Sequence, residues 1–566
     1  MRAFQPKPTD SDAAAELAKS LALHPVTAQL LVTRGYDTVE HAKRFLSPRL
    51  EQLHAPGELK DMDRAVAKIV AAIENRQRIA IYGDYDVDGV CSTAVLMRAL
   101  EALGAKPKAF IPHRVHDGYG LNGAALKRLR DDGIDLVVTV DNGTTRAAEI
   151  AEARESGMEM VVTDHHEPNG DLPDCPVVNP KRADASYPFS GLAGCGVAFK
   201  LAQALASQME AEKSPEFRAL WPDLLALVAI GTVADIVPLL DENRVIVRAG
   251  LQALAATKQP GLKALLKVAR LDGRRVFARD IGFKIGPRIN AAGRIGTAQL
   301  ALDLLLCDDD TEAAELAGKL DAANRERQQM ERRQSDEAME RAQAEIEATN
   351  APALVLADES WHAGLVGIIA MRVAEKFERP TICIAIDGEI ARGSARSFGG
   401  VFLHDALNDC TEHLLSHGGH AFAAGCTIQP ENIDAFRTAF VAAVEKQPRD
   451  AGGPQEVDAE LPIDAIHASL AGEIDRFRPF GAGNPEPVFC ACGVRAAGKP
   501  RRLGAAEKHL SFYAAGEQQS LRAIAFSQAD SEPLLKAPVD LAYVLRPGQG
   551  ADSIELQVRR IVASHQ

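Results

Sequence analysis

Short apolar runs alternate with amphipathic stretches from about residue 61 to residue 307. The runs at 79–82, 136–140 and 160–163 are apolar and largely β-branched, so each predicts a buried strand. The stretch from Val90 to Leu103 places its apolar residues at helical spacing. Strands that alternate with helices in this way predict a parallel sheet covered by helices on both faces, and therefore an α/β fold.

The pattern outside this region divides the rest of the chain. Residues 1–60 carry apolar positions at helical spacing and predict an N-terminal helical segment. Residues 311–349 contain no Pro and one Gly, which predicts a single connecting helix within 308–350. Residues 351–448 return to the α/β pattern. After a Gly/Pro break, the short β-type runs in 452–566 predict a small antiparallel barrel.

Composition places the chain among ordinary soluble proteins. Of its 566 residues, 46% are hydrophobic and 25% are charged, and no apolar run approaches the roughly 20 residues of a membrane span. The first residues lack the apolar centre of a signal peptide. Nine Cys without a CxxC pair argue against a disulfide framework or a zinc ribbon. We therefore expect a cytoplasmic protein with no membrane partner.

Acidic and imidazole side chains follow the predicted strands. Asp84, Asp86 and Asp88 come after the first, Asp141 after the second, and Asp164, His165 and His166 after the third, while Asp235 ends an apolar stretch further on. Parallel sheets bind ligands at the carboxyl ends of their strands, so these clusters are expected to face one crevice. In an extended segment, the alternate residues Asp84, Asp86 and Asp88 would point the same way, about 6 to 7 Å apart. The alternative is that such Asp residues only cap helices or make turns.

Mixed carboxylate and imidazole donors favour a divalent first-row metal. Manganese is expected, with magnesium or cobalt as substitutes, whereas zinc is less suitable because no Cys joins the set. Two ions about 3.5 to 4 Å apart would activate a water and neutralise both oxygens of a phosphoester displacement, and they would need this many ligands. The sequence therefore predicts a two-metal phosphoesterase centre.

These motifs carry a family resemblance. YGDYDVDG, VDNG, TDHH and TVADIVPL resemble motifs I to IV of the DHH phosphoesterase superfamily. Four later segments, GFKIGPRINAAGR, RGSARS, GGHAFAAG and PFGAGNPEP, resemble in the same order those of the RecJ family of bacterial single-strand-specific exonucleases. The resemblance implies a DHH catalytic domain at 61–307, the connecting helix at 308–350, a DHHA1 substrate-binding domain at 351–448 and a nucleic-acid-binding OB-fold at 452–566.

The resemblance also implies roles for individual residues. The metal ligands would be Asp84, Asp86, Asp88, Asp141, His165 and Asp235, with Asp164 orienting the imidazoles and His166 contacting the scissile phosphate. Arg114, Arg288, Ser394 and Arg396 would hold a 5′ phosphate, because guanidinium forks bind phosphate oxygens bidentately. Asn290 and His420 would reach the backbone nearby. The implied activity is 5′-to-3′ hydrolysis of single-stranded DNA to 5′-mononucleotides, in recombination and repair.

The net charge of −14 is the main objection to a nucleic-acid enzyme, since affinity for DNA rests largely on Lys and Arg. Local clusters of basic residues meet this objection in part. Basic residues without acidic neighbours in sequence could line a phosphate track: Lys284, Arg288 and Arg294, then Arg392 and Arg396, then Lys499, Arg501 and Arg502. The alternative is that each is a solvated surface charge.

Two other functions stay open. A DHH hydrolase of short oligonucleotides or cyclic dinucleotides would use the same metals, although a barrel with a basic stretch is useful mainly for a longer strand. An inactive scaffold would be expected to lack ligands, and every recognised metal position is present. The resemblance further implies single-strand-binding protein and a RecQ-type helicase as partners. Several domains in one chain give no evident need for a partner subunit, so a monomer is expected.

Overall fold

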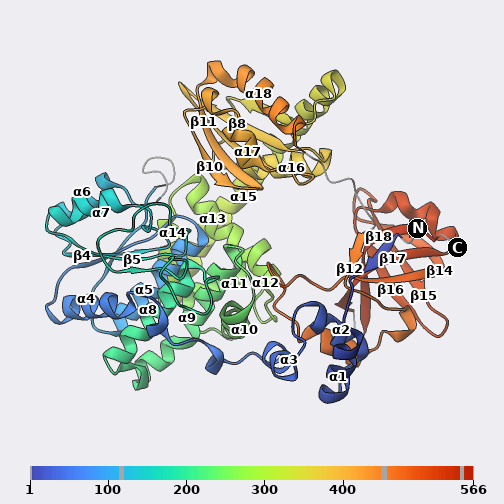
Figure 1. The fold of residues 1–566 in the computed structure, drawn as a ribbon, viewed down its shortest axis with the longest axis horizontal. Helices are drawn as coiled ribbons and strands as arrows, with labels where there is room; N and C mark the ends of the chain where they lie inside the picture. The colour runs from blue at the N-terminus through green and yellow to red at the C-terminus, as the bar shows by residue number, and fades with distance from the viewer. Residues whose placement is uncertain (1–2, 114–119, 448–454, 549–552, 565–566) are drawn as a thin grey trace.

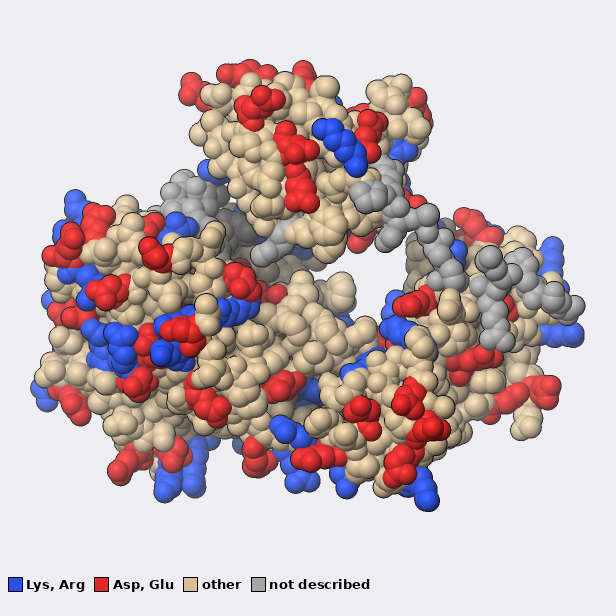
Figure 2. Space-filling model, viewed as in Figure 1, with Lys and Arg blue, Asp and Glu red and all other residues tan. Residues whose placement is uncertain are grey.

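A computed structural model describes residues 3–113, 120–447, 455–548 and 553–564. The chain forms three lobes (Figure 1): the parallel-sheet domain, a second α/β domain joined to it by a long helix, and a β-barrel beside which both termini lie. A space-filling view shows that an opening remains between the three lobes when side chains are included (Figure 2).

The first domain is built on a five-stranded sheet in the order β3-β2-β4-β5-β6, in which every pairing is parallel. Helices cover both faces, and the central strands β2 and β4 are buried on both sides, as continuous apolar runs require. This confirms the predicted α/β fold. The chain runs from β2 to β3 on one side and then returns to β4 on the other, so a crevice is expected beyond the carboxyl ends of β2 and β4. The strands are β2 (Ile79–Tyr82), β3 (Lys108–Phe110), β4 (Leu136–Val140), β5 (Glu159–Thr163) and β6 (Val177–Val178).

One helix of this domain, α9, is both long and apolar. Helix α9 is 20 residues long and apolar enough to cross a membrane by length and composition. Its longest stretch without a charged residue is 224–234, so the expectation that no apolar run approaches a membrane span stands, and α9 packs against α5, α8 and α10. The helices are α4 (Met62–Glu74), α5 (Val87–Ala102), α6 (Gly123–Asp131), α7 (Ala147–Glu155), α8 (Gly194–Gln208), α9 (Pro215–Ala234), α10 (Asp241–Ala255), α11 (Pro260–Val268), α12 (Ala278–Asp280), α13 (Gly286–Ile295) and α14 (Gln299–Leu306).

The predicted connecting helix is α15 (Asp310–Thr349), a single helix of 40 residues. Asp309 caps its first turn by accepting from the N–H groups of Thr311 and Glu312, and Asn350 ends it in the left-handed conformation. Its small buried residues pack against α11, α13 and α14 near one end and α16 near the other. The helix thus links the two α/β domains.

The second domain has a sheet in the order β10-β11-β9-β8-β7, with β7 and β8 parallel and the other pairings antiparallel. Helix α16 and the end of α15 cover one face, and α17 and α18 cover the other. Its elements are β7 (Leu354–Asp358), α16 (Val366–Phe377), β8 (Thr381–Asp387), β9 (Ile390–Arg396), α17 (Leu403–Asn408), β10 (Ser416–His420), β11 (Ala423–Ile428) and α18 (Ile433–Glu445).

The third lobe is a closed barrel, because β14 pairs with β17 as well as with β15. The prediction of an antiparallel barrel needs correction, since β16 pairs with β18 in parallel, as does β13 with β14. Its elements are β12 (Gln455–Val457), β13 (Ala459–Glu460), α19 (Ala468–Asp475), β14 (Phe489–Leu503), β15 (His509–Ala515), β16 (Ser520–Ala525), β17 (Val539–Pro547) and β18 (Ile554–Ala563).

The two ends of the chain share one core, which the sequence did not predict. Strand β1 (Phe4–Pro6) pairs in parallel with β12, and helices α1 (Ser11–Leu21), α2 (Pro25–Thr33) and α3 (Val39–Leu46) pack their apolar faces against the barrel. Leu17, Leu31 and Phe45 lie in the same buried cluster as Phe477, Phe489 and Tyr543. The N-terminal helices therefore belong to the barrel lobe rather than to a separate segment.

Candidate metal centre

The three carboxylates after β2 do not lie on one extended segment, as the sequence suggested. Helix α5 begins at Val87, so Asp86 is its N-cap and accepts from the N–H of Gly89 at 3.0 Å, while Asp88 lies in the first helical turn. The carboxylate of Asp88 accepts from the N–H groups of Gly194 at 2.7 Å and Cys195 at 3.0 Å, where α8 begins. The helix start, rather than strand alternation, thus sets the positions of Asp86 and Asp88.

Glycines make room for this cluster. A Cβ on Gly194 would stand 2.7 Å from the Cβ of Asp141, and one on Gly231 would stand 2.7 Å from Oδ1 of Asp88. A Cβ on Gly89 would meet the backbone of Asp84 at 2.6 Å. Any side chain at these positions would displace a carboxylate or its backbone, so glycine is required where α8 and α9 pack closest to the cluster.

The two central motifs supply the imidazole and another carboxylate. Asp141 follows β4 with φ 62°, a left-handed conformation that is uncommon for a residue other than Gly. His165 follows β5, and its Nε2 lies 3.1 Å from Oδ1 of Asp141, 3.6 Å from Oδ2 of Asp235 and 3.8 Å from Oδ2 of Asp88. Residues from two strand ends and from α5 and α9 therefore converge on one imidazole.

Asp164 holds the neighbouring histidine rather than joining this group. It accepts from the N–H of Thr144 at 2.9 Å, from the N–H of His165 at 2.7 Å and from Nδ1 of His166 at 2.8 Å. Although burial lowers the pKa of His166, the hydrogen bond and charge of Asp164 outweigh it and raise the pKa to about 9. At neutral pH His166 is therefore a cation with a fixed ring, and its side chain is 42% exposed.

Burial and mutual repulsion disfavour ionised carboxylates in the cluster. Burial raises the pKa of Asp141 well above its usual range, and the charges of Asp88 and Asp86 raise it further. Burial, followed by the same two neighbours, raises the pKa of Asp235 to about 8. Burial lowers the pKa of His165, which leaves its imidazole neutral. A bound cation would reverse the repulsion and would find neutral imidazole ready to coordinate.

The donor set fits divalent metal ions. Three groups of donor atoms each lie within 4.8 Å of one another: Asp84, Asp86 and Asp141; Asp88, His165 and Asp235; and Asp141, His165 and His166. Within the described residues, Oδ1 of Asp141 and both ring nitrogens of His165 are buried and make no hydrogen bond. Such groups are costly to bury unless something else binds them. The buried thiols of Cys91 and Cys195 lie nearby, but burial raises the pKa of both, so neither resembles a zinc thiolate.

Helix α13 connects the centre to the second α/β domain. A Cβ on Gly293 would stand 2.8 Å from the carbonyl oxygen of Tyr85, so α13 packs directly on the loop that carries Asp84 and Asp86. Arg294 donates to the carbonyl of Gly364 at 2.6 Å, just before α16. Asn290 lies on the same helix and is partly exposed. The helix therefore sets the position of the second domain relative to the cluster.

The predicted phosphate ligands of the second domain lie on β9. Arg392, Ser394 and Arg396 alternate with the buried residues of this strand, and Nη1 of Arg396 donates to Oγ of Ser394 at 3.1 Å. Burial lowers the pKa of the Arg396 guanidinium, which has no carboxylate partner within the described part of the chain. Arg114 and the side chain of His420 lie outside what the structure describes.

Several basic residues chosen for lacking acidic neighbours in sequence have acidic partners in the structure. Arg288 pairs with Asp321 of α15 at 3.0 Å, and Arg502 of the barrel pairs with Glu532 at 2.8 Å. Lys284 pairs with Asp280 at 2.8 Å, one helical turn earlier. The idea of a track of unpaired basic residues was therefore wrong for these three.

Several residues that support the cluster were not predicted from the sequence. Asn179 follows β6 and donates to Oγ1 of Thr144 and to the carbonyl of His166, both at 2.9 Å. These bonds stabilise the loop at 164–166. The N–H groups of Gly194 and Cys195 position Asp88. The only available signal was the position of these residues after strand-like and glycine-rich segments.

Family models match all three lobes. The N-terminal domain of the DHH family matches residues 78–232, the DHHA1 domain matches 350–446 and the RecJ OB domain matches 457–560. These assignments confirm the predicted DHH, DHHA1 and OB combination.

Relatives and solved structures agree with them. RecJ of Bacillus subtilis is 39% identical over 92% of this chain, which spans 65% of that protein, and RecJ of Dickeya dadantii is 37% identical over 81% of this chain and 82% of its own length. Both are named single-stranded-DNA-specific exonucleases.

The crystal structure of RecJ from Thermus thermophilus with Mn²⁺ superposes with a TM-score of 0.83 at 32% identity, covering 100% of this chain and 79% of that one. The same protein with Mg²⁺ gives a TM-score of 0.78. These two ions are the ones that the donor set predicts. With its three matched domains and this similarity to its relatives, the chain belongs to the RecJ family of the DHH superfamily.

Proposed function

We propose that this chain is a single-stranded-DNA-specific 5′-to-3′ exonuclease that releases 5′-mononucleotides. The observation that carries the proposal is the convergence of Asp88, Asp141 and Asp235 on the buried imidazole of His165. The names of the relatives support single-stranded DNA as the substrate.

We propose that Asp84, Asp86, Asp88, Asp141, His165 and Asp235 hold two divalent ions, Mn²⁺ or Mg²⁺. When bound, the ions supply an activated water and neutralise the charge that builds on the phosphate oxygens. His166 faces the same crevice as a cation, and because Asp164 holds its Nδ1, Nε2 is the ring nitrogen that donates to a phosphate oxygen. Asp164 is thus a positioning residue, which keeps the imidazole both oriented and charged.

We assign the 5′ phosphate to Ser394 and Arg396, together with Arg114. Arg396 is partly buried, already donates to Ser394 and faces Gly367 at the start of α16, where an added Cβ would lie 3.0 Å from Nη2. For Arg288, a phosphate would compete with Asp321, so we propose that it mainly orders α13 against α15. Arg294 orders the junction with the second domain, and Arg392, Asn290 and His420 are proposed to contact the strand backbone.

The runner-up is a hydrolase of short oligonucleotides or cyclic dinucleotides. It would use the same cluster, but it gives no role to a barrel lobe to which both ends of the chain contribute. An inactive scaffold is disfavoured because all six predicted ligands are present and belong to groups whose donor atoms lie within 4.8 Å of one another.

Digestion of single-stranded DNA labelled at either end, with Mn²⁺ or with EDTA, tests the proposal. We expect metal-dependent mononucleotide release from the 5′ end, little digestion of duplex DNA, and loss of activity in D141A. The variant R396Q should lose its preference for 5′-phosphorylated over 5′-hydroxyl strands. Hydrolysis of a dinucleotide but not of the long strand would assign the chain to the runner-up, and no hydrolysis would favour the scaffold.

The domain division, partners and location are proposals of the same kind. We propose a catalytic DHH domain, a substrate-binding DHHA1 domain and a nucleic-acid-binding barrel lobe that includes the N-terminal helices. Single-strand-binding protein and a RecQ-type helicase are proposed as partners by resemblance, with the chain acting as a monomer in DNA recombination and repair. A cytoplasmic location is supported by nine free cysteines, eight of them buried.

A further inference from the structure

Ile236 directly follows Asp235, the proposed metal ligand that ends α9, and its φ is 62°. This left-handed conformation is common just after a helix, but it favours Gly or Asn because a larger side chain crowds the backbone. Among the described residues that have a positive φ and are not glycine, Ile236 is the only one branched at Cβ. Branching makes the conformation more costly. The chain therefore places a poorly suited residue beside the metal centre.

The side chain of Ile236 recovers little of this cost by burial. It is 74% exposed, whereas its neighbours Val233 and Val237 are partly buried and pack against the core of the domain. A single exposed Ile is ordinary on a protein surface, but an exposed Ile on strained backbone is unfavourable in both respects. Strain of this kind clusters at sites that bind ligands. A contact with a ligand would explain both features of Ile236.

Hydrogen bonds on the C-terminal side hold the backbone near Ile236. The N–H of Leu239 donates to the carbonyl of Ala482 in the barrel lobe at 2.8 Å. The buried side chain of Asn243 donates to the carbonyl of Pro238 at 3.0 Å. These bonds anchor the segment 236–240, so the surroundings of Ile236 enforce its strained conformation.

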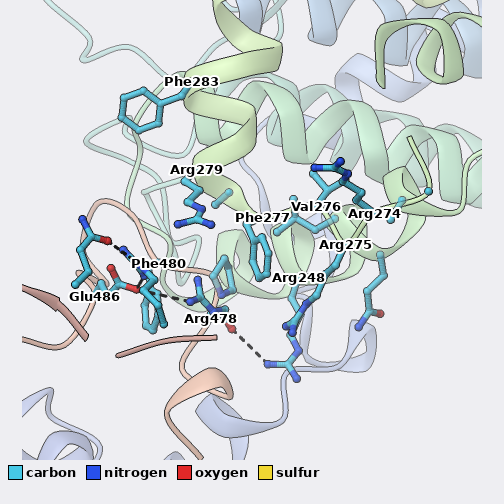
Figure 3. A pocket seen from close by; sticks show the side chains of 18 of the residues that line it. Arg248, Arg274, Arg275, Val276, Phe277, Arg279, Phe283, Arg478, Phe480 and Glu486 are labelled. Carbon is cyan, nitrogen blue, oxygen red and sulfur yellow. Dashed lines mark hydrogen bonds and ion pairs between the residues drawn. The ribbon is translucent and has the colours of Figure 1, made fainter. Parts of the chain in front are cut away.

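The barrel residues near this anchor are themselves packed on the catalytic domain. Figure 3 shows Arg478 beside Phe277 of the catalytic domain, and the Cζ of Arg478 lies 4.9 Å from the centroid of that ring. Arg248 of α10 donates to the carbonyl of Arg478 at 3.3 Å. The anchor of the segment 236–240 therefore belongs to a packed interface between the two lobes.

Ile236 lies at the open edge of the metal centre. Oδ2 of Asp235 is 3.6 Å from Nε2 of His165, and the Asp235 side chain is 23% exposed. The side chains of Asp88 and Asp141 are at most 2% exposed. Consecutive Cα atoms are about 3.8 Å apart, so Ile236 stands where the cluster opens to solvent. A strand whose phosphate binds at the centre must place a sugar or a base against this edge, and an aliphatic side chain offers it apolar contact.

We propose that Ile236 is a substrate-contacting residue, which inserts beside the base of the 5′-terminal nucleotide and separates it from the next base. The inference rests on the proposed function. Apolar side chains such as Ile act as wedges between neighbouring bases in other nucleic-acid-binding proteins. A β-branched side chain has few χ1 rotamers, and the anchored backbone fixes its direction. The wedge therefore keeps the scissile phosphodiester in position at the metal centre.

Thermal unfolding in EDTA tests the backbone strain. I236N introduces a residue that tolerates the left-handed conformation, so we expect the melting temperature to rise by about 2–4 °C. The matched control is E210N, because Glu210 is exposed, has φ 55° and directly follows the C-cap of α8, at the end of that helix opposite Gly194. E210N should raise the melting temperature by a similar or smaller amount. In both variants the calorimetric affinity for Mn²⁺ should stay within about twofold of wild type, because no ligand is changed.

Cleavage of a 5′-phosphorylated tetranucleotide with Mn²⁺ tests the base contact. We expect I236N to lower kcat about tenfold with KM within about twofold of wild type. I236V keeps the branched apolar side chain and should stay near wild type, as should E210N. Replacing the first base by an abasic site should lower the wild-type kcat by a similar factor. The abasic substrate should not lower the kcat of I236N further, because the contact is already lost.

Four results would overturn the inference. A lower melting temperature for I236N in EDTA would make Ile236 a structural residue, and weaker Mn²⁺ binding would mean that it acts through Asp235. Full activity of I236N, or a loss from the abasic site that adds to the loss from I236N, would exclude the base contact. No nucleotide release by the wild-type protein would instead refute the proposed function. The base contact is then tested by binding of the intact and abasic tetranucleotides, whose affinities should differ for wild type but not for I236N.

Discussion

Removing one negative charge from the metal-free centre should stabilise the protein. Asp235 ends α9, and its carboxylate shares a buried cluster with Asp88 and Asp86, so burial and repulsion raise its pKa from 3.8 to about 8. The folded state therefore binds more protons than the unfolded state between these two pH values. Stability of the metal-free protein should fall as pH rises through this window and level off above about pH 8.

The size of this destabilisation follows from the pKa shift. Ionising a carboxyl whose pKa is raised costs about 1.4 kcal/mol for each unit of the shift. The shift from 3.8 to about 8 therefore gives a ceiling of about 6 kcal/mol for the destabilisation caused by the ionised carboxylate of Asp235. The repulsion is shared among several coupled carboxylates, which reduces the effect of any one of them. We expect D235N to stabilise the metal-free protein by roughly 1–3 kcal/mol at pH 8.5, and less at pH 5, where the carboxyl is already protonated.

Thermal unfolding in EDTA at pH 5, 7 and 8.5 measures this effect. For a domain of 150–250 residues, 1 kcal/mol corresponds to about 2–4 °C. The control D272N changes an exposed carboxylate outside the cluster and should leave the melting temperature unchanged. With added Mn²⁺ the wild-type protein should melt at a higher temperature than D235N, because Asn is the poorer ligand. A lower melting temperature for D235N at pH 8.5 in EDTA, or a shift that is the same at every pH, would refute the electrostatic account.

The metal centre and the buried Lys200–Glu242 pair can be tested by three other measurements. Binding of Mn²⁺ at pH 7 should release protons from Asp235 and Asp141, so calorimetric enthalpies should depend on the buffer's ionisation enthalpy and affinity should rise with pH up to about 8; no buffer dependence would contradict the raised pKa values. D164N removes the anion that keeps His166 charged, so the alkaline limb of the pH–rate profile should move to lower pH and kcat should fall at least tenfold, whereas an unmoved limb would separate His166 from catalysis. K200M removes the cation paired with the fully buried carboxylate of Glu242, which would keep only its neutral donors, the N–H of His54 and the hydroxyl of Tyr187. It should cost about 3–5 kcal/mol of unfolding free energy, which K200M/E242Q should partly restore in denaturant titrations.

The local pattern was sufficient to place the strands that precede the candidate metal ligands. Strands β2, β4 and β5 and helix α15 lie where the apolar runs and the Pro-free stretch predict them, because each is encoded within a few neighbouring residues. The geometry of Asp84, Asp86 and Asp88 was not predictable in this way. It depends on Asp86 capping α5 and on Gly89, Gly194 and Gly231 admitting neighbouring helices, and these are tertiary contacts.

Long-range pairing explains the other differences. Nothing in the sequence near Arg288 indicates Asp321, which is 33 residues away, and nothing in the N-terminal helices indicates that their apolar faces pack on a barrel formed more than 400 residues later. The parallel pairing of β16 with β18 likewise depends on a closure that no single strand encodes. Apolar periodicity shows that a face must be covered, but it does not identify the element that covers it.

The positions of the charged residues, rather than their sum, decide whether a protein of net charge −14 binds DNA. The acidic excess includes the metal-centre carboxylates, which bound cations would neutralise, and the partners of arginines such as Arg288 and Arg502. A cavity between the parallel-sheet domain and the barrel lobe is lined by seven arginines that come from residues near 248, 274–279, 478, 546 and 559, so no continuous stretch of sequence contains its charge. Affinity for a polyanion depends on the potential at the site where it binds, which over a Debye length of about 10 Å is set by neighbouring groups in space. A net charge of −14 therefore argues against non-specific binding of nucleic acid over the whole surface. It does not argue against binding along one defined path of positive potential.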